Sequence, residues 1–438
     1  MSEWIGLLIA CALTVAIGLG VRRSGKYGPA LLKLILLALA LRVFGAVMRY
    51  EVLAQFYGGV GDAMAYFRDA NRYADAFWNL DLSPITDTDE WRNGNQWWGT
   101  TFVAWPTALV VMLVGESMRG GFVVFSLLSF AGLCGCVGAF ARSFQCVPVE
   151  RYARWVWLFP SLWFWPSSIG KDALILCGIG LFVYGFIGRR DPLRPERPLA
   201  VSWIWLVLGG ALVFAVRPQV AAVVIASAMG SIWLGTVGGS RRTKWFEIVA
   251  VGGAGLVGLY LALGQLGISG FDSEGVGDYL DQNTNRGDYG GSGFETGGEV
   301  GGGWSNIPVA FFNILFRPLP WEAHNITSLI SAVEIWGFWA IAWIQRKRVW
   351  LALKGCLRDR LLRFAIIFIL LYATLLGLLI ANAGIIARQR IFLFPFLFMF
   401  FEAVPVAATV ARQRLPRPRR RAVGVRQQSK RRLMEARK

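Results

Sequence analysis

Histidine is nearly absent from this chain, since His324 is the only one among 438 residues. A metal site built from several histidines is therefore excluded. Charged residues are also scarce, at 16%, whereas 55% of the residues are hydrophobic and 14% are aromatic. This composition excludes a soluble globular protein and predicts an all-α integral membrane protein.

Cysteine and the common catalytic motifs are also poorly represented. The six cysteines fall in apolar segments or in loops predicted to be cytoplasmic, so no external disulfide is expected. Cys134 and Cys136 have no histidine or cysteine partner nearby, which favours packing over metal binding. The sequence contains no P-loop, no dinucleotide glycine fingerprint and no nucleophile elbow.

Acidic residues are few, with 27 Asp and Glu against 45 Lys and Arg, which gives a net charge of +18. The basic residues stand in short clusters between apolar segments and are dense in the tail, residues 412–438. Such clusters are typical of cytoplasmic loops that contact anionic membrane lipids. They therefore favour a membrane surface over nucleic acid as the partner of this charge.

Placing each basic cluster in the cytoplasm predicts the topology. The polytopic domain, residues 1–411, then has about 11 transmembrane helices, an external N-terminus and a cytoplasmic tail. The first apolar segment, residues 4–20, lacks a preceding basic region and a clear small-residue cleavage site. We therefore expect it to be a retained span and not a signal peptide.

Two external segments are too long to be simple turns. Residues 49–120 are rich in aspartate, tryptophan and tyrosine, and we expect short helices on the membrane surface there. Within this segment, residues 101–114 contain Pro106 and are short for a span, which favours a re-entrant segment on the outer side. Residues 264–325 begin with a glycine-rich acidic stretch that predicts a flap, and its later prolines exclude one continuous interfacial helix.

Lys171 and Asp172 are the strongest candidates for a site. They end the motif Trp-Pro-Ser-Ser-Ile-Gly-Lys-Asp, residues 165–172, which lies between two apolar segments. Charges in such surroundings are costly unless they are paired or reach water, so they are functional candidates by default. The alternative is a pair that only ends a helix at the level of the lipid headgroups. Ser167 and Ser168 of the same motif are predicted to contact the substrate.

Asp62 is the candidate base. It follows several glycines, which allow the backbone to approach a ligand closely, and Tyr66 follows in the same segment. A carboxylate near the membrane surface can accept a proton from an acceptor hydroxyl. The alternative is a helix cap, in which Asp62 accepts hydrogen bonds from the amides of a helix that begins at Ala63.

External cations predict an anionic ligand, because arginine binds phosphate through two hydrogen bonds and lysine adds a point charge. Each arginine alone is equally compatible with a side chain that reaches a lipid headgroup. His324 is predicted to assist proton transfer or to form an interfacial hydrogen bond. The sequence leaves open whether Asp62, Asp172 or Glu322 binds a divalent cation. The predicted substrate-binding residues outside the motifs above are Arg217, Arg317, Trp321, Glu322, Arg388 and Arg390.

These motifs resemble those of bacterial multi-spanning GT-C glycosyltransferases, a group that includes protein mannosyltransferase-like and aminoarabinose transferase-like enzymes. The resemblance implies a GT-C-like fold in the bacterial inner membrane and a polyprenyl-phosphate-linked sugar donor. By position, it also implies that Asp62 is the catalytic carboxylate of the first external loop. The residues that carry the resemblance are the Asp62 motif, the motif at 165–172, Arg-Pro-Leu-Pro-Trp-Glu-Ala-His-Asn at 317–325 and Arg-Gln-Arg at 388–390.

The predicted function is transfer of a sugar from that donor to a glycan, lipid or protein acceptor at the extracytoplasmic face. Lys171 and the external arginines would hold the departing phosphate, and Asp172 would orient Lys171. Two alternatives stay open. In an O-antigen-type polymerase or ligase, the external arginines and His324 would carry the mechanism and Asp62 would be structural. In a transporter or flippase of a lipid-linked or anionic solute, polar residues would line both halves of the membrane.

Overall fold

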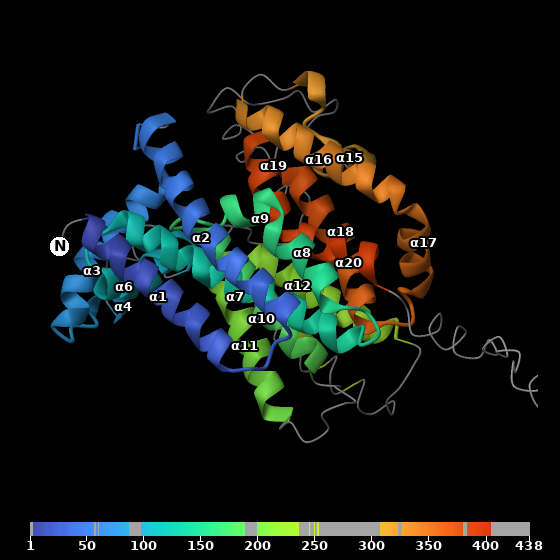
Figure 1. The fold of residues 1–438 in the computed structure, drawn as a ribbon, viewed down its shortest axis with the longest axis horizontal. Coiled ribbons are helices and arrows are strands. Elements are labelled where there is room, and N and C mark those ends of the chain that lie inside the picture. The colour runs from blue at the N-terminus through green and yellow to red at the C-terminus, as the bar shows by residue number, and fades with distance from the viewer. Residues whose placement is uncertain are drawn as a thin grey trace, which may run out of the picture.

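The structure of the chain, a computed structural model, is helical throughout the residues that it describes (Figure 1). These are residues 3–56, 58–59, 61–86, 98–188, 199–235, 245, 249, 252–253, 307–322, 326–379 and 383–403. The predicted all-helical class is confirmed for this part of the chain. The helices are α1 (Glu3–Arg23), α2 (Pro29–Phe56), α3 (Asp62–Trp78), α4 (Ser83–Thr86), α6 (Thr100–Val114), α7 (Met118–Ser143), α8 (Val149–Leu158), α9 (Pro160–Phe164), α10 (Lys171–Gly188), α11 (Leu199–Val216), α12 (Pro218–Trp233), α15 (Ile307–Phe316), η2 (Pro320–Glu322), α16 (Ile326–Ile344), α17 (Arg346–Gly355), α18 (Arg360–Leu379), α19 (Ala383–Gln389), η3 (Arg390–Phe392) and α20 (Phe394–Glu402).

Among the described residues, 5 helices are long and apolar enough to cross a membrane, namely α1, α2, α7, α10 and α18. The number rises to 7 if each of two bent pairs, α16 with α17 and α19 with α20, is one span. Helices α6, α11 and α12 are apolar but shorter. These lengths and compositions support a membrane protein, whereas the count of about 11 spans stays a prediction.

Helices α7 and α10 form the buried centre of the bundle and run parallel to each other. They approach closely because glycine lies at the contact: a Cβ atom built on Gly180 would lie only 1.8 Å from the carbonyl oxygen of Gly132. Helix α11 packs antiparallel against α10, where Gly178 lies against Val213. Small residues are typical of helix contacts in membrane bundles. They let two backbones approach closely, and the resulting van der Waals packing holds the helices together in lipid.

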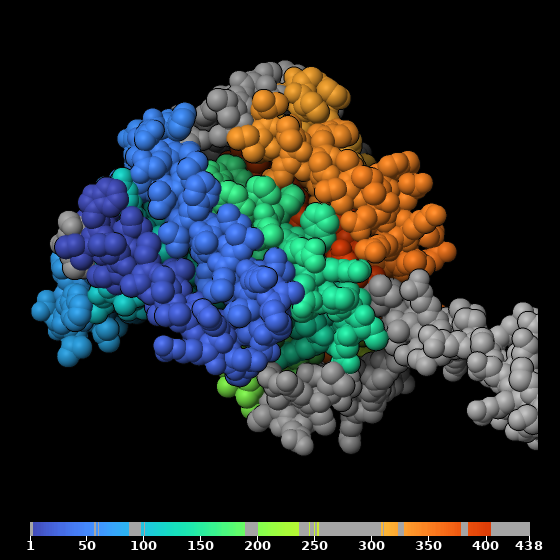
Figure 2. Space-filling model, in the orientation of Figure 1, coloured from blue at the N-terminus to red at the C-terminus, as the bar shows by residue number. Residues whose placement is uncertain are grey.

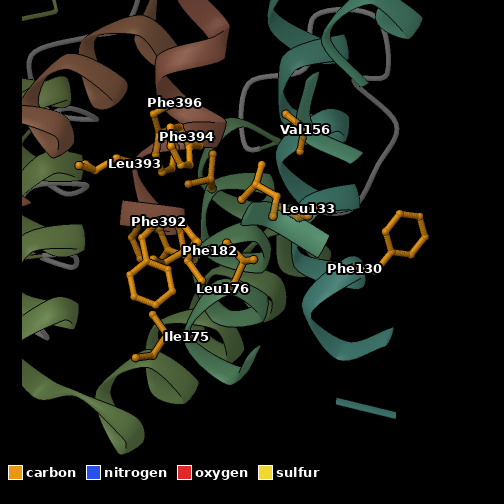
Figure 3. Close-up of a cluster of buried hydrophobic side chains, with 14 of the residues drawn as sticks. Phe130, Leu133, Val156, Ile175, Leu176, Phe182, Phe392, Leu393, Phe394 and Phe396 are labelled. Carbon is orange, nitrogen blue, oxygen red and sulfur yellow. The ribbon is translucent and has the colours of Figure 1, made fainter. Parts of the chain in front are cut away.

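The C-terminal helices close this core with aromatic side chains. In Figure 1 the N-terminal helices lie on the left and α15–α20 lie on the right, with α7 and α10 between them. Segments far apart in the sequence therefore meet beside α10. Figure 3 shows Phe392, Leu393, Phe394 and Phe396 of the C-terminal segment next to Ile175, Leu176 and Phe182 of α10.

The helix directions give the bundle two ends with different charges. At one end, here called the site end, α2 finishes and α7 begins, and Glu51 pairs with Arg119 at 3.0 Å. At the other, here called the basic end, Arg142 of α7 donates a hydrogen bond to the Tyr184 carbonyl of α10 at 3.0 Å. The basic end carries Arg22, Arg23, Lys26, Arg142, Arg151, Arg154, Arg346, Lys347, Arg348, Arg360 and Arg363.

The segment 49–120 contains short helices, as the sequence predicts. Helix α3 packs against α6 through a small apolar cluster that includes Ala70, Ala74 and Val111. Helix α6 has 15 residues, which give it a length of about 22 Å, less than the apolar thickness of a bilayer. Its re-entrant placement stays a prediction. The glycine-rich stretch up to residue 306 and the tail 412–438 lie outside the described residues.

One predicted span differs from the structure. The apolar segment that precedes the Lys171 motif, residues 155–165, reads in the sequence as one helical span, but the structure divides it between the end of α8 and the short α9. The division lies at Phe159, which is extended with φ −65° and ψ 127°, and is followed by Pro160. Proline has no N–H to donate and clashes with the preceding turn, so the helix cannot continue through it.

Candidate functional site

The candidate site is built on the segment that follows this break. After α9 the chain passes Pro166, turns through residues 165–170 and enters α10 at Lys171. Lys171 and Asp172 therefore occupy the first turn of a buried helix at the site end. The two charges lie there because prolines prevent the preceding segment from forming one continuous helix with α10.

Glu334 of α16 caps the start of α9. Its Oε1 accepts a hydrogen bond from the Ser161 N–H at 2.7 Å, and its Oε2 is hydrogen-bonded to the Ser161 hydroxyl. The extended conformation of Phe159 deprives this N–H of a carbonyl in the preceding turn, so Glu334 supplies the missing acceptor. A negative charge at a helix N-terminus is also favoured by the helix dipole.

Arg42 of α2 caps the end of the same short helix. Its Nη1 donates to the Leu162 carbonyl at 2.8 Å and to the Ser129 hydroxyl at 3.1 Å. In a continuous helix this carbonyl would accept from residue 166, but Pro166 has no N–H. Arg42 is fully buried, with its guanidinium 5.4 Å from the ring centroid of Phe130. Positive charge at a helix C-terminus again suits the dipole.

Neither Arg42 nor Glu334 is among the site residues predicted from the sequence. Arg42 and Glu334 stand inside apolar segments, which composition identifies only as spans. The available signal was the isolated charge in each segment, since ionisable residues within a membrane are rare and almost always have partners or functions. The sequence alone does not show that the residues they contact, Ser161 for Glu334 and Leu162 for Arg42, lie on the same five-residue helix.

Ser167 holds the turn against α7. Its hydroxyl lies 2.6 Å from the hydroxyl of Ser126 and donates to the Trp163 carbonyl at 2.5 Å. The side chain is fully buried, so this geometry does not support the substrate contact predicted for Ser167. Ser168, the next residue in the turn, is half-buried.

Five charged side chains from four segments gather around the start of α10. The Lys171 ammonium lies within electrostatic range of two carboxylates, Asp62 and Asp172, and of two guanidinium groups, Arg217 and Arg388. Three positive and two negative groups leave one net positive charge on the cluster. The sequence-based proposal that these residues share one end of the bundle therefore agrees with their positions.

Asp172 forms its ion pair with Arg388 of α19, whose Nε donates to Oδ2 of the carboxylate. The two residues are 216 positions apart. The side chain of Asp172 is only 4% exposed, whereas that of Arg388 is 29% exposed. Asp172 also acts electrostatically on Lys171, and its predicted role in orienting Lys171 stays a prediction.

Asp62 and Tyr66 approach the cluster from α3. The N-cap of α3 is Gly61, Asp62 is the first helical residue, and no side chain caps this helix, which contradicts the predicted capping role of Asp62. Asp62 is exposed, whereas Tyr66 is buried. A Cβ atom built on Gly170 would lie 4.0 Å from Tyr66 Cε2 and 3.8 Å from Arg388 Nη2, which places these two side chains around the turn.

Arg217 reaches the cluster from the junction of two helices. It is the N-cap of α12, its side chain is half-buried, and Pro218 follows at the first helical position. Both Arg217 and Asp172 act electrostatically on Tyr372 of α18, whose hydroxyl donates to Gln389 Oε1 at 3.3 Å. Solvent exposure thus decreases across the cluster, from the exposed Asp62 through the half-buried cations to the buried Asp172.

The remaining predicted residues lie in a neighbouring structural unit. Arg390 is buried, and its guanidinium donates to the carbonyls of Ile314, at 2.7 Å, and Arg317. Arg317 in turn pairs with Glu322 at 2.9 Å. These contacts hold α15 and η2 against η3 and give Arg390 a structural role, whereas its predicted contact with substrate stays a prediction.

Trp321 and His324 complete the set of predicted residues. Trp321 is 75% exposed, and its predicted role in substrate binding stays a prediction. His324 lies outside the described residues. Within the described parts of the chain, no group of three or more His, Cys, Asp or Glu side chains is placed to hold a metal ion.

The cluster is suited to an anionic ligand that reaches it from the side of Asp62. Its two half-buried cations, Lys171 and Arg217, provide positive charge where water is partly excluded, and the exposed carboxylate can accept a proton. No protein-family model matches this chain, and neither do curated proteins or solved structures. The interpretation of the site therefore depends on its own geometry.

Proposed function

We propose that this protein is a membrane glycosyltransferase that moves a sugar from a polyprenyl-phosphate-linked donor to a glycan, lipid or protein acceptor at the extracytoplasmic face. The observation that supports this proposal is the meeting of Asp62, Lys171 and Arg217 at one end of an apolar bundle. A lipid-linked phosphate suits this position, because its anionic group can bind the cations and its long apolar chain can lie along the apolar helices.

In the proposed reaction, Asp62 accepts the proton of an acceptor hydroxyl as its oxygen bonds to the anomeric carbon of the sugar. The bond between that carbon and the phosphate oxygen breaks, and the polyprenyl phosphate leaves with an additional negative charge. Lys171 and Arg217 stabilise this charge because it develops beside them in a partly dehydrated place. Asp172 fixes Arg388 through its ion pair, so that the guanidinium lies at the cluster in one orientation.

The distribution of charge supports the external placement of the site. Cytoplasmic loops carry the excess of lysine and arginine in membrane proteins. The basic end of this bundle carries clusters of arginine and lysine at or near the ends of its helices, whereas the cations at the site end are mixed with carboxylates such as Glu3, Glu51 and Asp62. The site end then faces the extracytoplasmic side.

The test is sugar transfer in proteoliposomes supplied with polyprenyl-phosphate sugars that carry a radiolabel in the sugar. Asp62→Asn is expected to lower the turnover by about 100-fold or more, because the base is lost. Asp69→Asn is the matched control, since Asp69 lies on the same helix and pairs with Arg72 at 2.9 Å on the surface. Full transfer by Asp62→Asn would reject Asp62 as the base and favour the polymerase mechanism.

A transporter or flippase is the second candidate, and one observation favours it. Arg42 and Glu334 place charged groups within apolar helices, beside a broken helix, and discontinuous helices form the substrate sites of many transporters. In the same proteoliposomes, movement of the labelled lipid across the bilayer without a new glycosidic bond would favour this candidate over the transferase.

A further inference from the structure

A separate hollow lies at the basic end, away from the charged cluster. Its volume is about 700 Å³, within the range of about 300–1,000 Å³ that small-ligand sites occupy. It lies between α8, α17 and α20, and Figure 2 shows red atoms of the C-terminal region between the green and orange surfaces. The lining residues are Arg151, Arg154, Trp155, Leu158, Phe159, Pro160, Arg348 and Glu402.

The rim of this hollow has an excess of positive charge. Its three arginines face one carboxylate, which leaves two positive charges. Arg348 lies 3.5 Å from Glu402, so the one carboxylate is already paired. Arg151 and Arg154 are exposed and form no ion pair with the described part of the chain. The rim therefore offers an external anion two guanidinium groups without a carboxylate partner, beside the third, that of Arg348, which Glu402 partly neutralises.

The opposite wall is apolar and aromatic. Trp155 is stacked on Phe398 with ring centroids 5.5 Å apart, and Phe159 lies against Phe394 at 4.5 Å. The rings are therefore held in place by α20. Leu158 also lines the hollow and adds to its apolar surface. A small hydrated anion gains nothing from such a wall, whereas a ligand with a hydrocarbon chain buries apolar surface against it.

The neighbouring helix indicates the level of the membrane surface. Helix α17 bends by 79° from the direction of α16, which it follows directly in the chain. Trp343 and Trp350 are 71% and 59% exposed, with Arg346 and Lys354 over their rings at 5.2 and 5.1 Å. Exposed tryptophans beside outward-reaching cations are typical of the lipid headgroup region.

We propose that this hollow is a binding site for an anionic phospholipid. The lipid phosphate lies between Arg151, Arg154 and Arg348, and an acyl chain follows the wall formed by Trp155 and Phe159. The charge of the rim selects an anionic headgroup, and the apolar wall selects a lipid over a soluble anion. This site is independent of the proposed sugar transfer.

The test uses native mass spectrometry of the purified full chain, titrated in detergent with phosphatidylglycerol and, separately, with phosphatidylcholine. The triple variant Arg151→Gln/Arg154→Gln/Arg348→Gln is expected to bind phosphatidylglycerol about tenfold more weakly or worse, with phosphatidylcholine unchanged. The matched control is Arg22→Gln/Arg23→Gln/Lys26→Gln, which removes the same charge from exposed positions at the basic end. The control is expected to change the affinity by less than about twofold.

Two outcomes with these variants overturn the proposal. They are an unchanged affinity in the triple variant, or an equal loss in the control, which would indicate diffuse surface charge. A competition experiment on the wild-type chain tests the proposal even if the variants fail to fold. Glycerophosphoglycerol, the headgroup without acyl chains, is expected to leave bound phosphatidylglycerol in place. Displacement by this headgroup at comparable concentration would show a soluble-anion site instead.

Discussion

The ion pair between Asp172 and Arg388 gives the sharpest test of the site's construction. Asp172→Asn keeps the shape of the side chain but removes its charge. Breaking a buried pair by removing one partner costs about 3–5 kcal/mol, because the other charge stays without compensation. Here Arg388 is 29% exposed, and Asp62 also acts on it electrostatically. We therefore expect a smaller loss of about 2–3 kcal/mol in the free energy of unfolding.

A double-mutant cycle separates this pair from its surroundings. The variants are Asp172→Asn, Arg388→Gln and the two combined, and the double variant should be less destabilised than the sum of the singles. We expect a coupling energy of about 2 kcal/mol. The surface pair Asp69–Arg72 has nearly ideal geometry at 2.9 Å but is 32% and 68% exposed, so its coupling should stay below about 0.5 kcal/mol.

The measurement is reversible unfolding in mixed micelles, in which the mole fraction of dodecyl sulfate is raised and near-ultraviolet circular dichroism is followed. Tryptophan is abundant in this chain, with 20 residues, so the loss of packed aromatic rings gives a strong signal. Additivity of the Asp172 and Arg388 variants within about 0.5 kcal/mol would refute the reasoning, because uncoupled residues do not form one charge pair.

Two further predictions concern the framework around the site. Gly180→Ala is expected to lower the unfolding free energy by about 1–3 kcal/mol, because its Cβ would lie 1.8 Å from the Gly132 carbonyl oxygen. The control Gly337→Ala meets open space on α16 and should be neutral or stabilising. Equal effects of the two variants on the unfolding free energy would contradict the close packing of α7 and α10. Glu334→Leu is expected to cost about 1–3 kcal/mol by leaving the Ser161 N–H and hydroxyl unpaired, and Glu334→Gln, which retains an acceptor, should cost less. A Gln variant as unstable as the Leu variant would contradict the capping role.

The sequence was sufficient to predict the class of the protein and the grouping of its charges. Low charge and long apolar segments predict membrane helices, and the positions of the basic clusters predict which loops share a side. From that topology alone, Asp62, Lys171 and Arg217 were expected to meet, and Asp62 and Arg217 each lie within electrostatic range of Lys171. Such grouping is predictable because a membrane restricts each loop to one of two sides.

The partners of individual charges were not predictable in the same way. Arg388 and Arg390 stand in one predicted external motif, yet Arg388 pairs with Asp172 and Arg390 is buried against Ile314 and Arg317. Residues two positions apart on a helix do not share a face, so the two arginines of an Arg-Gln-Arg motif point to different surroundings. A topology fixes the level of a side chain in the membrane, whereas its partner depends on the rotation and packing of every neighbouring helix.

The break between α8 and α9 bears on the choice between a transferase and a transporter. In transporters, the ends of discontinuous helices are left available, so that their main-chain groups bind the substrate or its ions. Here the chain itself occupies both ends of α9, with Glu334 on the Ser161 N–H and Arg42 on the Leu162 carbonyl. A substrate at this depth would first have to displace two charged side chains from their hydrogen bonds within an apolar environment, which is costly. The capped break instead supports a fixed turn that carries Lys171 to the site end, where Asp62 is exposed, and this arrangement favours chemistry at the membrane surface over passage through its centre.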